Sequence, residues 1–144
     1  MHALLRNTLF LGLTSLAACT TPASQAPASL ADTSWTLVAY RPSSGAELRP
    51  ARPDQYRLHF QADGGLSAQI DCNRGSGSWQ TTDQQGGIRL GPLALTRMMC
   101  PPAPLNIQLP AAIETLQSYR VIDGQLQLQA ADNAGTYIWQ RVQP

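Results

Sequence analysis

Short stretches in which apolar and polar residues alternate make up most of the chain from residue 32 onward. In one of them, Tyr56, Leu58 and Phe60 are separated by single polar residues. Such alternation places the apolar side chains on a buried face of a sheet and the polar ones in water. It predicts about eight strands, or nine if both arms of one hairpin are counted, at about residues 34–41, 55–61, 65–71, 76–82, 87–91, 92–97, 118–123 joined to 125–130, and 135–142.

Turn signals separate these stretches. Glycine stands with or near Asp, Gln or Asn at residues 63–65, 85–87, 123–124 and 133–135. Gly, Asn and Asp tolerate the positive φ that tight hairpin turns need. Short strands at regular spacing between such turns indicate an antiparallel barrel or sandwich.

One segment has helical periodicity, with apolar residues spaced as on one face of a helix. Asn106 is a candidate N-cap, but Pro110 is tolerated only near the first turn, so the helix is expected at about 109–117. The predicted fold is therefore mainly β, of the α+β class. It is a small antiparallel, barrel-like or half-barrel sheet with one packed helix. The apolar stripe consists of Leu105, Leu109, Ala112, Ile113 and Leu116.

The first eighteen residues indicate an export signal. Arg6 precedes an apolar run of about a dozen residues, which is shorter than the roughly 20 residues a membrane-spanning helix needs. The run ends in Leu16-Ala17-Ala18-Cys19, which resembles the bacterial lipobox, where the cysteine receives a diacylglyceryl group. An ordinary secretory signal with an incidental cysteine is the alternative.

The lipobox interpretation divides the chain into a signal peptide at 1–18, a lipidated Cys19 with a tether to residue 31, and a domain at 32–144. Two or three acyl chains give lasting attachment to a membrane. By resemblance to Gram-negative lipoproteins, Thr20 after the cysteine favours the outer membrane, given a Gram-negative host. We therefore expect a lipid-anchored envelope protein that faces the periplasm.

Composition limits the possible activities. The formal net charge is +1 and lysine is absent, which argues against nucleic-acid binding and excludes lysine-dependent catalysis. After the signal, His59 is the only histidine, and the acids are spread singly rather than paired. We expect a monomer that is not an enzyme and has no cofactor.

Cys72 and Cys100 are the two cysteines that remain after lipidation. In an oxidising envelope such a pair most often forms a disulfide. A metal or redox site is the alternative, although a zinc site usually has four protein ligands, or three and an open position.

Around these cysteines the sequence resembles the META domain family, which includes the HslJ-type heat-shock lipoproteins. The segment 71–79, DCNRGSGSW, resembles the family's GCN motif followed by G-x-aromatic. Residues 95–100, LTRMMC, resemble its T-[RK]-M-x-C motif, and 30–37 resemble its opening. The resemblance implies a small β-rich barrel with a packed helix, a disulfide between the two cysteines, and a role in envelope stress. Asp71 departs from the usual Gly, but Asp also tolerates positive φ.

Three polar residues beside the cysteines are candidate contacts for a partner or ligand: Asn73, Arg74 and Arg97. For Asn73 and Arg74 we favour simple turn chemistry, in which Asn bonds its own backbone. For Arg97 we favour a salt bridge with Asp71 across the disulfide over binding of an external carboxylate. The three tryptophans are expected in the core or on a sheet face.

Three functions remain open from the sequence. The first is a non-enzymatic envelope lipoprotein that supports outer-membrane integrity or stress response. The second is a barrel that holds a small apolar ligand, and the third is a hydrolase or a partner-binding inhibitor. A hollow interior would favour the second, and a filled interior with a protruding loop would favour the first or an inhibitor.

Overall fold

The computed structural model describes residues 28–82 and 84–143, so the signal peptide, Cys19 and most of the tether lie outside the described residues. Within them the chain forms nine strands, one α-helix and two short 3-10 turns. The strands are β1 (Thr33–Pro42), β2 (Tyr56–Phe60), β3 (Gly65–Ile70), β4 (Asn73–Thr81), β5 (Ile88–Leu90), β6 (Ala94–Leu95), β7 (Leu116–Ile122), β8 (Gln125–Ala130) and β9 (Gly135–Arg141). The helices are η1 (Pro53–Gln55), α1 (Pro104–Ile113) and η2 (Ala131–Asn133).

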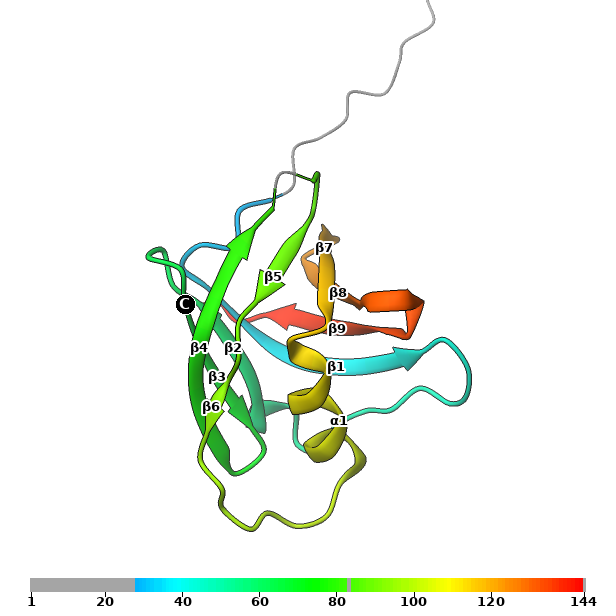
Figure 1. Cartoon of the computed structure of the whole chain (residues 1–144). Coiled ribbons are helices and arrows are strands. Elements are labelled where there is room, and N and C mark those ends of the chain that lie inside the picture. The colour runs from blue at the N-terminus through cyan, green and yellow to red at the C-terminus, as the bar shows by residue number, and fades with distance from the viewer. Residues whose placement is uncertain (1–27, 83, 144) are drawn as a thin grey trace, which may run out of the picture.

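The strands form a nearly closed antiparallel barrel, which confirms the predicted fold class. The order across the sheet is β5-β4-β3-β2-β1-β9-β8-β7, and β6 pairs with β4 beside this path. The two ends of the sheet meet where the Tyr119 amide donates to the Gly86 carbonyl at 2.7 Å. Figure 1 shows the curved sheet with α1 beside the loop that follows β6.

The barrel interior is occupied by side chains. The alternating positions of β1, β3 and β8 are buried in turn, as the period-two pattern predicts. They meet residues of α1 and the other strands in one continuous hydrophobic cluster. Burial raises the pKa of the Tyr137 hydroxyl, because the phenolate would lose its hydration there. The largest fully buried side chains include Trp35, Trp139, Tyr137 and Phe60.

The prediction of the helix at 109–117 is wrong in its bounds. The helix α1 runs from Pro104 to Ile113 and begins with a proline, whose missing N–H has no partner at that position anyway. It also accommodates Pro110 in its interior, at the cost of one backbone hydrogen bond. Leu116, which we assigned to the helical stripe, is instead the first buried residue of β7.

The folded part begins before residue 32, so the expected boundary between tether and domain is too late. Leu30 is only 1% exposed and belongs to the core. Its carbonyl accepts a hydrogen bond from the Thr33 hydroxyl, and the Ala28 carbonyl accepts one from Tyr119 at 3.2 Å. These contacts bind the beginning of the described chain to the barrel.

The two ends of the barrel differ. Figure 1 places the beginning of the described chain near the connection between β4 and β5, and the loop between β6 and α1 at the opposite end.

In the described part of the chain, no helix is long and apolar enough to cross a membrane.

The two central tryptophans give a test of the core. Trp35 Nε1 donates to the Thr33 hydroxyl at 2.7 Å, whereas Trp139 Nε1 is buried without a partner among the described residues. Trp35→Phe should therefore lower the free energy of unfolding by about 1 kcal/mol more than Trp139→Phe, because only the first change removes a hydrogen bond. Urea unfolding of both variants measures this difference, and the reverse order would contradict it.

Candidate functional site

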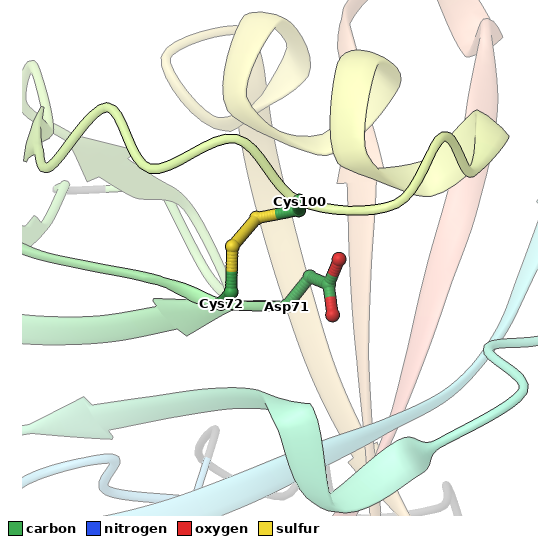
Figure 2. Close-up of side chains that lie close together, drawn as sticks. All are labelled: Asp71, Cys72 and Cys100. Atoms are coloured by element: carbon green, nitrogen blue, oxygen red, sulfur yellow. A yellow bond between two sulfur atoms is a disulfide. The ribbon is translucent and has the colours of Figure 1, made fainter.

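A disulfide holds the barrel end that lies opposite the beginning of the described chain. Cys72 belongs to the two-residue turn between β3 and β4, and Cys100 to the loop between β6 and α1. The two are bonded, with Cα atoms 5.7 Å apart, and Figure 2 shows the bond joining the sheet turn to the loop. With Asp71, the two sulfur atoms form a group of metal-ligand type. A disulfide sulfur is not a thiolate, so this group does not constitute a metal site.

The turn between β3 and β4 depends on Asp71. Ile70 pairs with Asn73, which leaves Asp71 and Cys72 as the two turn residues. Asp71 has a φ of 55°, a left-handed conformation that Asp and Asn tolerate better than most residues. The expectation that Asp here can replace Gly at a positive φ is confirmed.

The side chain of Asp71 does not pair with Arg97, so the predicted salt bridge is wrong. Its Oδ2 accepts a hydrogen bond from the Asn106 amide at 2.8 Å. Its Oδ1 accepts one at 2.8 Å from the amide nitrogen of Gln55, in the orientation that satisfies both ends of that amide. Figure 2 shows the carboxylate to one side of the disulfide, below the chain that continues from Cys100, and one of its oxygens lies within 4.8 Å of both sulfur atoms. Arg97 is exposed, and in residues 28–82 and 84–143 it forms no ion pair.

Asn73 is a strand residue that braces the β6–α1 loop, and the turn-chemistry interpretation is wrong for it. Its Oδ1 accepts hydrogen bonds from the Met98 amide at 2.7 Å and the Thr96 hydroxyl at 2.9 Å. Its Nδ2 donates to the Met98 carbonyl at 3.2 Å. The loop is thereby held with Met98 62% and Met99 100% exposed.

Arg74 contributes its backbone rather than its side chain. Its amide donates to the Thr96 hydroxyl at 3.1 Å, and its carbonyl accepts from the Thr96 amide at 2.9 Å. Arg74 is exposed, and its guanidinium forms no ion pair with a described residue. Of the three candidate contact residues, Asn73 is thus structural, while Arg74 and Arg97 present free charges to solvent.

Beside the disulfide lies a cleft of about 560 Å³, which we call the proline cleft. One wall is the chain before β2, and the other is the segment that leads from Cys100 into α1. The floor is formed by the β3–β4 turn and by Tyr56 at the start of β2. The lining residues are Leu48, Arg49, Pro50, Ala51, Arg52, Gln55, Tyr56, Asp71, Cys72, Pro101, Pro102, Ala103, Pro104 and Leu105.

Asn106 links the floor of the cleft to α1. We expected it to cap the helix, but it is the third helical residue, and Ala103 occupies the N-cap position without a side-chain cap bond. Its side chain instead accepts a hydrogen bond from the Tyr56 hydroxyl and donates to the Asp71 carboxylate and the Pro101 carbonyl. Asn106 therefore fixes the position of the Asp71 carboxylate.

The electrostatics of the cleft are uneven. The pKa of the Tyr56 hydroxyl is raised, first by burial and then by the negative charge of Asp71. At the rim, Arg49 pairs with Glu47 at 2.6 Å, and Arg52 donates to the Gln55 amide oxygen at 3.1 Å. The sequence did not indicate that Asn106 and Gln55 are the partners of Asp71. It did mark one wall of the cleft by the run Pro101-Pro102-Ala103-Pro104.

His59 lies away from the cleft, on the outer side of β2. It is half-buried, and its Nδ1 shares a hydrogen bond with the Ser34 hydroxyl at 2.9 Å across the β1–β2 pair. This position agrees with a strand histidine on the polar side of the alternation.

The fold and the cysteine motifs agree with the comparisons. The family model of the META domain matches residues 28–143. The chain belongs to the META domain family. The match begins at Ala28, in agreement with the burial of Leu30.

Solved structures resemble this META domain. An NMR structure of a protein from Burkholderia xenovorans has a TM-score of 0.65 and 27% identity, over 87% of this chain and 99% of that one. A crystal structure of a DUF4847 family protein from Bacteroides vulgatus shares the fold, with a TM-score of 0.58 and 15% identity over 77% and 93% of the chains. No curated protein matches the chain.

The disulfide should contribute strongly to the stability of the META domain. The Cys72→Ser, Cys100→Ser double variant should lower the free energy of unfolding by about 3–4 kcal/mol, because the bond closes a loop of about 29 residues in the unfolded chain. Urea unfolding measures the loss. Alkylation without reductant should find both cysteines unreactive in the oxidised protein, and labelling of either under those conditions would contradict the bond.

Asn73 should be needed to order the β6–α1 loop. Asn73→Ala should speed hydrogen exchange of the Met98 amide and lower the free energy of unfolding by about 1–2 kcal/mol, because the amide loses its acceptor. Asn73→Asp is the matched control, since it keeps the acceptor for Met98 and Thr96 and should change the exchange rate less. Unaltered exchange in Asn73→Ala would show that the loop is held by the disulfide alone.

Proposed function

We propose that this META domain protein is a non-enzymatic, lipid-anchored protein of the cell envelope that works by binding through its disulfide end. The observation that carries the proposal is the filled interior of the barrel. Because side chains from the strands and α1 occupy that space, a ligand or partner has only the outer surface to bind. At the disulfide end this surface offers a cleft and a braced, exposed loop.

The chemistry of the cysteines and of His59 supports our proposal that the protein is not an enzyme. Cys72 and Cys100 are bonded to each other, which removes both as nucleophiles. His59 is hydrogen-bonded to a serine hydroxyl on the outer face of the sheet and lies outside the residues that line the cleft. A Ser–His pair becomes an activated nucleophile only when a third group orients the imidazole, and among the described residues no carboxylate is paired with His59.

The envelope location is supported by the disulfide and by the lipobox. Disulfides persist in oxidising compartments such as the periplasm. A lipid on Cys19 would attach the protein near the barrel end where the described chain begins, opposite the proline cleft (Figure 1). The cleft then faces away from the bilayer, where an envelope protein or a small apolar ligand can reach it. We place the anchor in the outer membrane and the role in support of outer-membrane integrity under stress.

The Cys19 anchor can be tested in cells. Wild-type protein should incorporate radiolabelled palmitate and sediment with membranes, and Cys19→Ala should lose the label because no other thiol is positioned for acylation. Thr20→Asp is the matched control, since it should keep the label while moving the protein to the inner-membrane fraction. Acylation of Cys19→Ala would contradict the lipobox interpretation.

The same variants test the envelope role. Cells that lack the protein should take up more of the dye N-phenylnaphthylamine under heat stress, and wild-type protein should reverse this where Cys19→Ala does not. Equal uptake with and without the protein would contradict a role in outer-membrane integrity.

A further inference from the structure

The proline cleft holds a carboxylate without a cationic partner. Each oxygen of Asp71 accepts one hydrogen bond, and both donors are neutral amides, those of Asn106 and Gln55. A carboxylate has about four acceptor positions, so acceptor capacity is left over. Throughout residues 28–82 and 84–143, Asp71 takes part in no ion pair. Its negative charge is therefore fixed in place by groups that do not neutralise it.

The negative charge of Asp71 acts inside the cleft. The residue is half-buried at the floor, so its field is screened less than that of an exposed acid. Tyr56, which lines the same floor, responds to it through a raised pKa, after the larger effect of burial. A group that enters the cleft therefore meets a negative potential.

The two arginines of the cleft do not cancel this potential. Arg49 has a side chain that is 65% exposed and is paired with Glu47. Arg52 is exposed as well, and its guanidinium reaches Asp71 only through the intervening Gln55 amide. Water screens both charges more strongly than it screens the half-buried carboxylate.

The remaining lining of the cleft is apolar and stiff. Four of the lining residues are prolines, whose rings fix φ, and Leu48 and Leu105 add aliphatic surface. A wall that is already ordered loses little conformational entropy when a ligand binds. The volume of about 560 Å³ falls in the range of small-molecule sites, roughly 300–1,000 Å³.

From this geometry we infer that the proline cleft binds an organic cation, an amine on an apolar body, with Asp71 as its counter-ion. The ammonium group donates to the free acceptor positions of the carboxylate, and the apolar body lies between the proline-rich walls. This inference rests on the proposed binding function and names the chemical class that the disulfide end recognises. An unpaired carboxylate inside an apolar cleft selects for positive charge because a neutral or anionic ligand would leave it uncompensated.

Phenethylamine and phenethyl alcohol are matched probes, since they share the aromatic body and differ in charge. Each is titrated into the full chain carrying Cys19→Ala, which removes the lipid. The readout is the pair of side-chain amide signals of Asn106 and Gln55 in proton–nitrogen correlation spectra. The amine should shift both signals and bind about tenfold more tightly than the alcohol, a difference of about 1.4 kcal/mol.

Asp71→Asn tests the counter-ion, because Asn keeps the shape of the side chain and tolerates the positive φ. It should weaken the amine about tenfold and leave the alcohol unchanged. Asp123→Asn is the matched control, since Asp123 also has a positive φ of 51° but lies in the turn between β7 and β8, outside the cleft. It should leave both affinities unchanged. If Asp71→Asn unfolds, Asp71→Gly removes the charge with an even more permissive backbone.

Equal affinity for amine and alcohol, or equal losses in Asp71→Asn and Asp123→Asn, would overturn the inference. So would the absence of any shift in the Asn106 and Gln55 signals. These results would not change the outcome of the dye-uptake experiment. The titrations therefore test the ligand class, and dye uptake tests the envelope role independently.

Discussion

The bond between Cys72 and Cys100 is the contact on which the geometry of the candidate site depends. It fixes a loop without regular structure against the end of the sheet, and Asn73 supports the same loop with four hydrogen bonds. Because the loop is held there, the chain that follows Cys100 can form one wall of the proline cleft. The same position brings the first turn of α1 to Asp71, so that Asn106 can orient the carboxylate.

The hydrophobic core and the proline cleft are built from largely different residues, and share Tyr56 and Leu105. Aromatic and aliphatic side chains fill the interior of the barrel and form a single cluster. The Asp71 carboxylate, which has free positions to accept hydrogen bonds, lies in the cleft at one end. A residue such as Asp71 can therefore change without loss of core contacts, provided that its replacement accepts the positive φ. Asp combines that conformational tolerance with a charge, which links the turn chemistry of the fold to the chemistry of the cleft.

The close approach of the following segment to β4 shows why glycine stands at position 77. A Cβ on Gly77 would lie 2.8 Å from the Pro92 carbonyl, closer than real Cβ contacts allow. The segment that contains β6 therefore approaches β4 only because glycine stands there. From the sequence, Gly77 is recognisable as part of a motif, but its physical role depends on a segment that arrives fifteen residues later in the chain.

The sequence by itself determined the approximate positions of the strands, most of their turns and the family, because alternation and turn chemistry are local properties of the chain. It located the helix but not its bounds, since the packing of Leu105 and Leu109 into the core outweighs the interruption by Pro110. The partner of Asp71 was decided only by the tertiary structure. Arg97 carries the opposite charge and was the predicted partner of Asp71. The carboxylate instead accepts hydrogen bonds from the side-chain amides of Gln55 and Asn106. Which side chains meet at a sheet end depends on the path of loops held by distant contacts, and that information is not present in any local pattern.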